Sequence, residues 1–369
     1  MLEITRPTKM VINIDNFKHN IEVIKSKLNN GANIMPVVKA NAYGTYLNTR
    51  LDVLNMFDIV AVATVDEGVY IRELGFKKDI FVLNQPYFEE IEKIIKSDLT
   101  IGISSDSFAK KLGEYNEKIK VHVEIGTGMG RTGINPSRVE EYINKLPQNV
   151  IVEGVYTHMS SADNDKEYTE KQLKSFDYAV EQAKKLVDLK YIHAAASNAI
   201  FNFNDSHYNL VRPGMIMYGY DSDEETCKDI DLKPVATLKS KVTFLKTVKA
   251  GTSIGYNRSY ITDKETKVAT IPIGYADGFR RCLSNKGKVL INGKLVSIIG
   301  KICMDGFMAD VTELDNVNVG DDVFIWDNET ITLDELAKQC DTINYEILST
   351  ISNRVPREFI WILWLFNKL

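Results

Sequence analysis

The sequence predicts an α/β protein: a (β/α)8 TIM-like barrel followed by a mostly β C-terminal domain. Between Ile34 and about Arg212, short β-branched and apolar runs alternate with amphipathic stretches at helical spacing, which is the pattern of parallel strands joined by helices. After about Leu232, strand-like alternation with Gly and Asn turns replaces the helical stretches. We therefore expect a barrel domain over residues 1–232 and a β domain over residues 233–369.

The individual elements follow from the same patterns. A first helix is expected over Asn16–Leu28, with Asp15 as its N-cap. Apolar residues at helical spacing indicate later helices near Phe88–Ile95 and Thr169–Val187. In the second domain, "INGK" predicts an Asn-Gly hairpin. The expected barrel strands, about as many as a closed barrel needs, are Ile34–Val38, Ile59–Thr64, Ile80–Leu83, Thr100–Ser104, Lys120–Ile125, Ile151–Tyr156, Tyr191–Ala195 and Tyr208–Val211.

Composition excludes several classes of protein. The 369 residues carry a formal net charge of -5, so no general basic surface is available for nucleic acid or anionic lipid. The four cysteines are scattered, without CxxC or metal-ligand spacing, which suggests reduced thiols in a cytosolic compartment and no metal site. No signal peptide is visible between Met1 and Met10. The apolar stretch Phe359–Phe366 is far shorter than the roughly 20 residues that span a bilayer. We expect it to pack as a terminal strand or helix, with an interaction or membrane-contact tail as the alternative.

Polar side chains follow the predicted strands where a barrel places its chemistry, at the carboxyl ends. In chain order they are Lys39, Asn84, Arg131, His158, Ser197 and Arg212. The first of them ends a short buried strand in "PVVKANAYG", and an ordinary solvated lysine is the alternative there. The loops after the seventh and eighth strands offer a phosphate the hydroxyl of Ser197 and the backbone N–H groups of Gly214 and Met215. A phosphate-bearing cofactor that faces a lysine suggests a Schiff base with pyridoxal 5′-phosphate (PLP).

Seven motifs carry a more specific signal. In order, "VVKANAYG", "GTGMGRTG", "YTHMSSAD", "VRPGMIMYG", "IPIGYADG", "ICMDGFMAD" and "RVPREF" span nearly the whole chain. With this series the chain resembles the alanine racemases, the fold-type III PLP enzymes. The resemblance implies a PLP-binding barrel, a β domain and a head-to-tail homodimer in which the partner's β domain completes each active site.

The resemblance also implies roles for individual residues. Lys39 and Tyr256 of the partner subunit are the two catalytic bases, on opposite faces of the cofactor, because racemisation removes a proton from one face and returns one to the other. The implied cofactor contacts are Lys39, Tyr43, Arg131, His158, Ser197, Arg212, Gly214 and Met215. The implied substrate contacts are Arg131, Tyr275, Met304, Asp305 and Asn353. Taken singly, each has an ordinary structural explanation, such as packing or a salt bridge.

Three positions depart from the family pattern. Asn353 stands where alanine racemases offer a tyrosine, which frees space beside the substrate β-carbon and adds a donor and an acceptor. Glu124 stands where many relatives have a lysine and is a candidate to neutralise Arg131, and Ala196 replaces an asparagine before Ser197. The Asn353 exchange is similar to that of the membrane-bound vancomycin-resistance serine racemases.

From this likeness we expect interconversion of L-serine and D-serine with residual alanine activity, which supplies D-serine for modified peptidoglycan precursors in glycopeptide resistance. The membrane-bound resemblance implies a chain on the cytoplasmic side, tethered by an N-terminal membrane domain absent from this sequence. An alanine racemase that makes D-alanine for the cell wall is the alternative. A non-catalytic PLP carrier lacks the β domain, and a PLP decarboxylase or aldolase has other motifs.

Overall fold

The computed structural model describes residues 5–29, 31–221 and 229–361. The chain divides into two compact units. The barrel unit holds His19–Leu232, and the β unit holds the residues up to Lys18 together with those from Lys233 onward. The expected barrel domain began at residue 1, but strand β1 (Lys9–Asn13) pairs with β10 (Ala236–Lys241) and β19 (Arg357–Ile360) of the β unit. Met10 and Ile12 of β1 are fully buried, and this burial is the reason that the segment joins the sheet.

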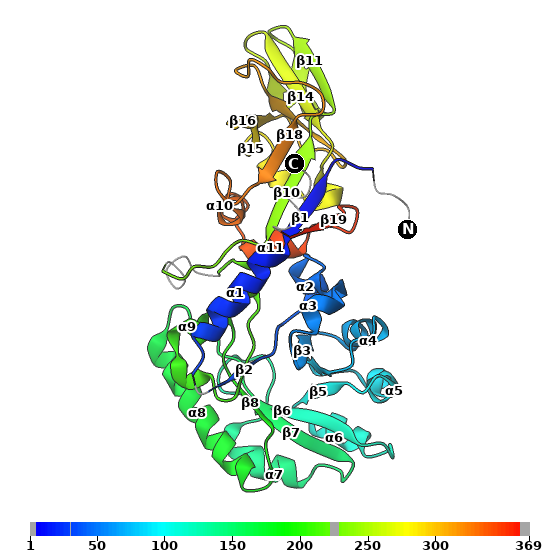
Figure 1. Cartoon of the computed structure of the whole chain (residues 1–369), viewed down its shortest axis with the longest axis vertical. Helices are drawn as coiled ribbons and strands as arrows, with labels where there is room; N and C mark the ends of the chain where they lie inside the picture. The colour runs from blue at the N-terminus through cyan, green and yellow to red at the C-terminus, as the bar shows by residue number, and fades with distance from the viewer. Residues whose placement is uncertain (1–4, 30, 222–228, 362–369) are drawn as a thin grey trace. The chain divides into compact units, whose positions relative to one another are not determined.

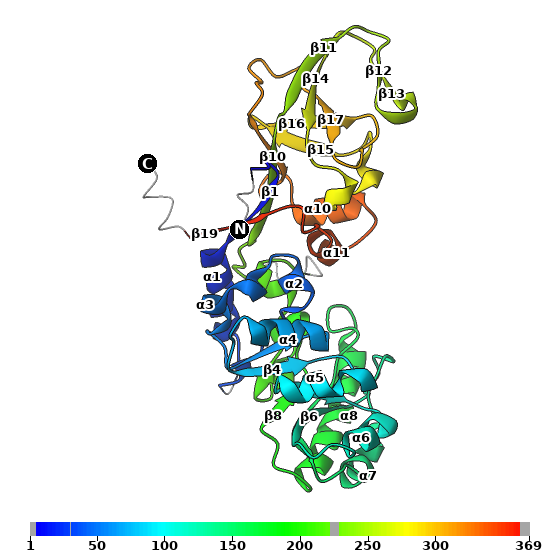
Figure 2. The ribbon, with the colours of Figure 1, turned by 90° about the vertical axis from the view of Figure 1, so that its right-hand side faces the viewer.

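Parallel strands form the frame of the barrel unit. Strands β3 to β8 lie side by side in chain order (Figures 1 and 2). Strand β2 pairs with β9, and parallel bridges from Val37 to Ala61 and from Ala196 to Arg212 join this pair to β3 and β8. The pairings close the ring, so the predicted barrel is confirmed. The strands are β2 Asn33–Ile34, β3 Ile59–Val62, β4 Asp79–Val82, β5 Thr100–Ile103, β6 Ile119–Glu124, β7 Val150–Tyr156, β8 Tyr191–His193 and β9 Leu210–Val211.

Helices lie outside these strands (Figure 1). They are α3 Leu51–Leu54, α4 Val65–Glu73, α5 Ile91–Lys96, α6 Asp106–Leu112, α7 Val139–Asn144, α8 Lys166–Lys184 and α9 Ser197–Asn202. The first helix, α1 (Ile14–Ser26), begins earlier than expected. The side chain of Asn13 accepts hydrogen bonds from the N–H groups of Asp15 and Asn16, so Asn13 supplies the N-cap and the prediction of Asp15 is wrong.

The strand interiors are packed with apolar side chains. Val60, Phe81, Ile101 and Val121 are fully buried, and each such side chain stabilises the fold by about 1.5–3 kcal/mol. Above them, the Tyr156 hydroxyl donates to the carbonyl oxygen of Leu83 (2.8 Å). These side chains fill the barrel interior and support the groups at the strand ends.

The β unit is built on one mixed sheet. Its strand order is β11-β14-β17-β16-β15-β18-β10-β1-β19. The further elements are β11 Phe244–Val248, β12 Ser253–Ile254, β13 Tyr260–Ile261, β14 Thr266–Ile271, β15 Lys288–Ile291, β16 Lys294–Ile299, β17 Phe307–Asp310, β18 Asp322–Trp326, α10 Leu333–Gln339 and α11 Asn344–Ser349. The predicted hairpin is confirmed: Asn292 (φ 49°) and Gly293 (φ 75°) turn β15 into β16.

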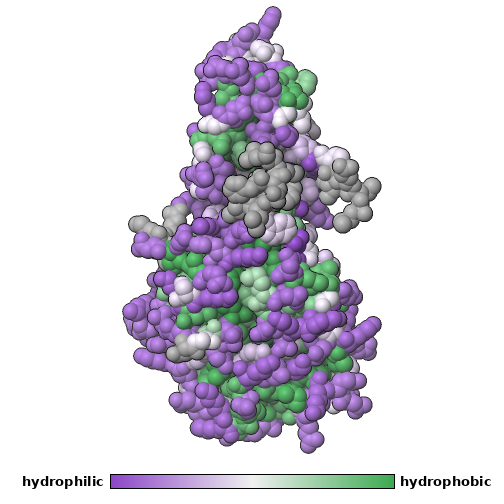
Figure 3. All heavy atoms as spheres, in the orientation of Figure 1, coloured by the Kyte–Doolittle hydropathy of each residue, from purple (hydrophilic) through white to green (hydrophobic). Residues whose placement is uncertain are grey.

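Hydrophilic side chains dominate the molecular face shown in Figure 3, with smaller apolar patches between them. Among the described residues, no helix combines the length and the apolar character needed to cross a bilayer. Phe359 and Ile360 of the apolar stretch lie in strand β19, as one of the two expectations had it. Residues 362–366 of that stretch lie outside the described residues, as does Cys227.

Candidate active site

Lys39 stands at the start of a strained turn, α2 (Lys39–Tyr43). Ala40, Asn41, Ala42 and Tyr43 all have left-handed φ angles, between 51° and 55°. For residues with a side chain, this conformation costs about 1–2 kcal/mol each. Such strain persists only where the surroundings impose it, and it clusters at functional sites. The strain in this turn therefore indicates that the fold fixes the position of Lys39.

Glu67 is the side chain that anchors this turn. Its Oε1 accepts the N–H of Ala40 (2.7 Å), and its Oε2 accepts the N–H groups of Ala63 (2.8 Å) and Thr64 (3.2 Å). One carboxylate thus ties the residue after Lys39 to the end of β3. Sequence reasoning missed Glu67, although Thr64 and Glu67 form the capping box of α4, which "TVDE" signals.

Ser197, Gly214, Met215 and Tyr43, predicted as phosphate contacts, come together. Ser197 Oγ accepts the N–H of Gly214 (3.1 Å), and Met215 follows at the start of a buried 3-10 turn. A Cβ on Gly214 would lie 2.6 Å from the Tyr43 hydroxyl. Glycine at this position therefore lets the main chain of Gly214 and Met215 approach the hydroxyls of Ser197 and Tyr43 closely. This donor set suits a phosphate.

Arg212 is almost completely buried, with 3% of its surface exposed. Its guanidinium donates to His193 Nδ1 (2.9 Å) and to the carbonyl oxygens of Thr157 (2.7 Å) and Ala194 (3.1 Å). Because arginine only donates, His193 Nδ1 must accept, so His193 Nε2–H donates to Nδ1 of His122 (2.8 Å). Burial holds the pKa of His193 well below its ordinary value and lowers that of His122 to about 3. Both imidazoles are therefore neutral at neutral pH.

Sequence reasoning missed His193 and His122. The available signal was a polar residue inside a predicted buried strand: Tyr191–Ala195 contains His193, and Lys120–Ile125 contains His122.

Cationic side chains surround Lys39. Burial, followed by the charge of Arg131, lowers the pKa of Lys39, while Glu67 opposes the shift and Arg212 adds to it. His158 Nδ1 lies 3.4 Å from Nη2 of Arg212, and burial and the charges of Arg212 and Arg131 lower the pKa of His158 to about 3. The structure thus brings Lys39, Arg131, His158 and Arg212 into one electrostatic environment. Its effect is to favour a neutral lysine amine.

The remaining predicted site residues belong to the β unit. Tyr256, Met304 and Tyr275 are large side chains with 66%, 52% and 42% of their surface exposed. Tyr256 follows Gly255, whose φ of 72° starts the turn that presents it. Asp305 and Asn353 are also exposed. These side chains lie outside the core of their own unit and are available to another surface.

Two family models cover the chain: the alanine racemase N-terminal domain matches residues 12–222, and the alanine racemase C-terminal domain matches residues 235–359. The chain belongs to the alanine racemase family. It is 40% identical to the alanine racemase of Carboxydothermus hydrogenoformans, over 96% of this chain and 100% of that one. With alanine racemase 2 of Caldanaerobacter subterraneus subsp. tengcongensis the identity is 38%, over 98% and 97% of the two chains.

Solved structures of the family agree with the fold. The alanine racemase of Clostridium difficile 630 superposes with a TM-score of 0.91 at 36% identity, over 98% of this chain and 97% of that one. The Bacillus anthracis alanine racemase with bound L-Ala-P has a TM-score of 0.91 at 33% identity, over 97% and 96% of the two chains. The family relationship predicted from the motifs is therefore confirmed, and the relatives named here are all alanine racemases.

Family members use PLP, and the barrel unit fits this cofactor. Ser197, Gly214, Met215 and Tyr43 would hold its phosphate, and Lys39 offers the amine. The hydrogen bonds that Arg212 makes to the described residues use Nη1 and Nη2. Glu124 forms no ion pair with Arg131 within the described residues. Instead, its carboxylate accepts from the Thr132 hydroxyl (2.7 Å).

Proposed function

We propose that this chain is a PLP-dependent racemase that interconverts L-alanine and D-alanine by a two-base mechanism. The observation that carries the proposal is that Lys39 on its strained turn and the contact between Ser197 and Gly214 occur in a chain that two alanine racemase family models match over residues 12–222 and 235–359. Bound PLP supplies the carbonyl group that captures the amino acid and the ring that withdraws electrons from its α-carbon.

Lys39 serves as one proton carrier. Its lowered pKa, caused first by burial and then by Arg131, favours the neutral amine that can accept the α-proton. Arg131 is exposed and forms no ion pair within the described residues, so its guanidinium remains available for the substrate carboxylate. Arg212, which only donates hydrogen bonds, keeps the pyridine nitrogen unprotonated and limits the electron withdrawal.

Tyr256 of the partner subunit serves as the second proton carrier in a homodimer. The support is the family resemblance together with the high exposure of Tyr256 on its own β unit. Tyr275 and Met304 are exposed in the same unit. Together with Asp305, they line the substrate site of the partner subunit.

A mixed dimer tests this arrangement. Lys39→Ala and Tyr256→Phe subunits with different tags are co-expressed, and the heterodimer is purified. If Lys39 works with Tyr256 of the partner subunit, both lesions fall in one site, and the heterodimer keeps about half of the wild-type activity while each homodimer is inactive. An inactive heterodimer would show that both bases of a site come from one chain. Tyr260→Phe, a nearby tyrosine of the same unit, is the control.

Serine is a second candidate substrate, and Asn353 is the observation that favours it. An exposed carboxamide in place of the family's tyrosine offers a hydrogen-bonding partner to a hydroxymethyl group. The relatives do not support a serine preference, so the preference, and with it a role in glycopeptide resistance and a membrane tether, stays a prediction that rests on this residue and the motif resemblance.

A chiral assay with L-alanine and L-serine decides between the substrates. One neutral hydrogen bond contributes about 0.5–1.5 kcal/mol, so Asn353→Tyr should lower the serine-to-alanine ratio of kcat/KM by about 2- to 10-fold. Asn353→Gln, which keeps the carboxamide, is the matched control. A strong alanine preference that Asn353→Tyr leaves unchanged would remove serine from consideration. Absence of α-proton exchange in deuterated water would instead indicate a non-catalytic PLP carrier.

A further inference from the structure

Three loops of the β unit carry the predicted substrate-facing residues, and main-chain hydrogen bonds join them. The N–H of Tyr275 donates to the carbonyl oxygen of Cys303 (3.1 Å), and that of Ala276 donates to Met304 (3.1 Å). The third loop joins through the N–H of Ser352, which donates to the carbonyl oxygen of Asp277 (3.0 Å). Tyr275, Met304 and Asn353 therefore share one framework.

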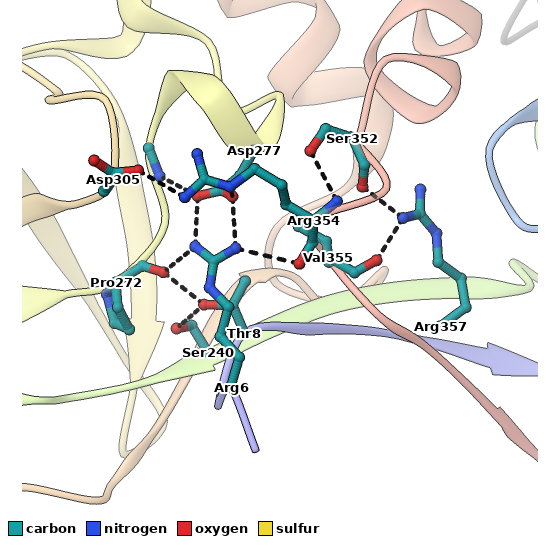
Figure 4. A network of polar contacts seen from close by, with 11 residues as sticks. Arg6, Thr8, Ser240, Pro272, Asp277, Asp305, Ser352, Arg354, Val355 and Arg357 are labelled. Atoms are coloured by element: carbon teal, nitrogen blue, oxygen red, sulfur yellow. Dashed lines mark hydrogen bonds and ion pairs between the residues drawn. The ribbon is translucent and has the colours of Figure 1, made fainter. Parts of the chain in front are cut away.

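The carboxylate of Asp277 lies in the middle of this framework and is fully buried. Arg6 grips it with two parallel hydrogen bonds, Nη1 to Oδ1 and Nη2 to Oδ2, both 2.6 Å long (Figure 4). The N–H of Gly274 donates to Oδ2 (2.9 Å), and Nε of Arg354 lies 3.5 Å from Oδ1. Bidentate arginine–carboxylate pairs are geometrically specific, so Asp277 can take only one place between the loops.

Two arginines extend the network to both sides of Asn353. Arg354, the next residue, donates from Nη2 to Asp305 Oδ1 (2.7 Å), so it bridges the carboxylates of Asp277 and Asp305. Arg357 donates to the carbonyl oxygens of the Asn353 turn, which are those of Ile351 (2.7 Å), Ser352 (2.7 Å) and Val355 (2.5 Å). The backbone around Asn353 is therefore held from within the β unit.

We propose that Asp277, gripped by Arg6 and Arg354, is the positioning residue that keeps Tyr275, Met304 and Asn353 in one constellation and so sets the rate and the amino-acid preference. The inference rests on the proposed racemase function, because it gives these side chains a substrate to face. A misplacement of about 1 Å can cost about 100-fold in rate. Buried ion pairs are weak contributors to stability compared with apolar packing, and geometric definition is the better explanation of this one.

Arg6→Gln in the full-length holoenzyme tests the proposal, with the wild-type chiral assay run first. Below the melting temperature, the folded variant should lose about tenfold or more in kcat/KM for L-alanine and change the serine-to-alanine ratio. Arg6→Lys, which keeps the charge but not the bidentate geometry, should recover part of the loss. Lys9→Gln, which removes the surface pair between Lys9 of strand β1 and Glu358 of strand β19 (2.5 Å), should leave the kinetics unchanged.

Hydrogen–deuterium exchange supplies a readout that does not depend on activity. Arg6→Gln should speed exchange at Tyr275, Ala276 and Ser352, while strand β14 keeps its wild-type rates. Wild-type kinetics and wild-type exchange in these loops would overturn the inference. If Arg6→Gln does not fold, the same measurements on Arg6→Lys decide. An inactive wild-type enzyme would instead refute the proposed function, and the exchange rates would still test the positioning role.

Discussion

Replacing Glu67 by glutamine tests how the fold imposes the place of Lys39. Glutamine keeps one acceptor oxygen and turns the other into a donor, so either Ala40 or the pair Ala63 and Thr64 loses its partner. A hydrogen bond to a charged group contributes about 1.5–3 kcal/mol, and we take the lower value because Glu67 is only half-buried. The left-handed turn itself stores about 4–8 kcal/mol, so it has little capacity to absorb the loss.

If the lost hydrogen bond displaces Lys39 and so raises the activation free energy by about 1.5 kcal/mol, kcat/KM for L-alanine falls about tenfold. A second readout follows from charge: the Glu67 carboxylate raises the pKa of Lys39 against the lowering effect of burial. Without it, the pKa of Lys39 falls further. The pH dependence of PLP capture by the Glu67→Gln apoprotein should therefore shift to lower pH.

Two controls separate this effect from general damage to α4. Asp66→Asn removes the neighbouring carboxylate, which pairs with Lys93 on the surface (2.7 Å), and exposed pairs contribute at most about 1 kcal/mol. Thr64→Ala breaks the capping box but leaves the bond from Glu67 to Ala40. Both controls should keep near-wild-type kinetics. If Glu67→Gln behaves as they do, within about twofold, the reasoning is refuted.

Two further results are expected. Gly214→Ala puts a Cβ 2.6 Å from the Tyr43 hydroxyl. Overpacking of this kind costs about 1–3 kcal/mol, so PLP should bind the apoprotein about 5- to 150-fold more weakly in an absorbance titration. Burial is the largest cause that lowers the pKa of His122 and His158 to about 3, although the charge of Asp79 opposes it at His122, whereas the unfolded chain keeps the ordinary value of 6.5. The unfolded state therefore takes up protons that the folded state does not, and stability falls below about pH 6.5. Together with His193, whose pKa burial also holds well below its ordinary value, these groups should cost about 4 kcal/mol between about pH 7.5 and 5.5, measured by urea unfolding, and a flat profile would contradict the assignment.

Local patterns in the sequence determine a large part of the fold and of the candidate site. The eight barrel strands lie within a few residues of their predicted places, because buried β-branched runs and helical periodicity are local properties. The Asn-Gly hairpin at Asn292 depends on two adjacent residues and was predictable for the same reason. Strand ends located Lys39, His158 and Arg212, since a barrel gathers such ends at one rim.

Only the tertiary structure decided which distant groups meet. Residues up to Lys18 join the β unit because β1 pairs with β10 and β19, a pairing that no local pattern encodes. The hydrogen bonds from Arg6 to Asp277 and from the Ala40 N–H to Glu67 join residues that are far apart in the chain. Local sequence patterns report on residues a few positions apart, whereas hydrogen bonds depend on positions in space. The sequence therefore determined the type of site, and the folded chain decided what holds its parts in place.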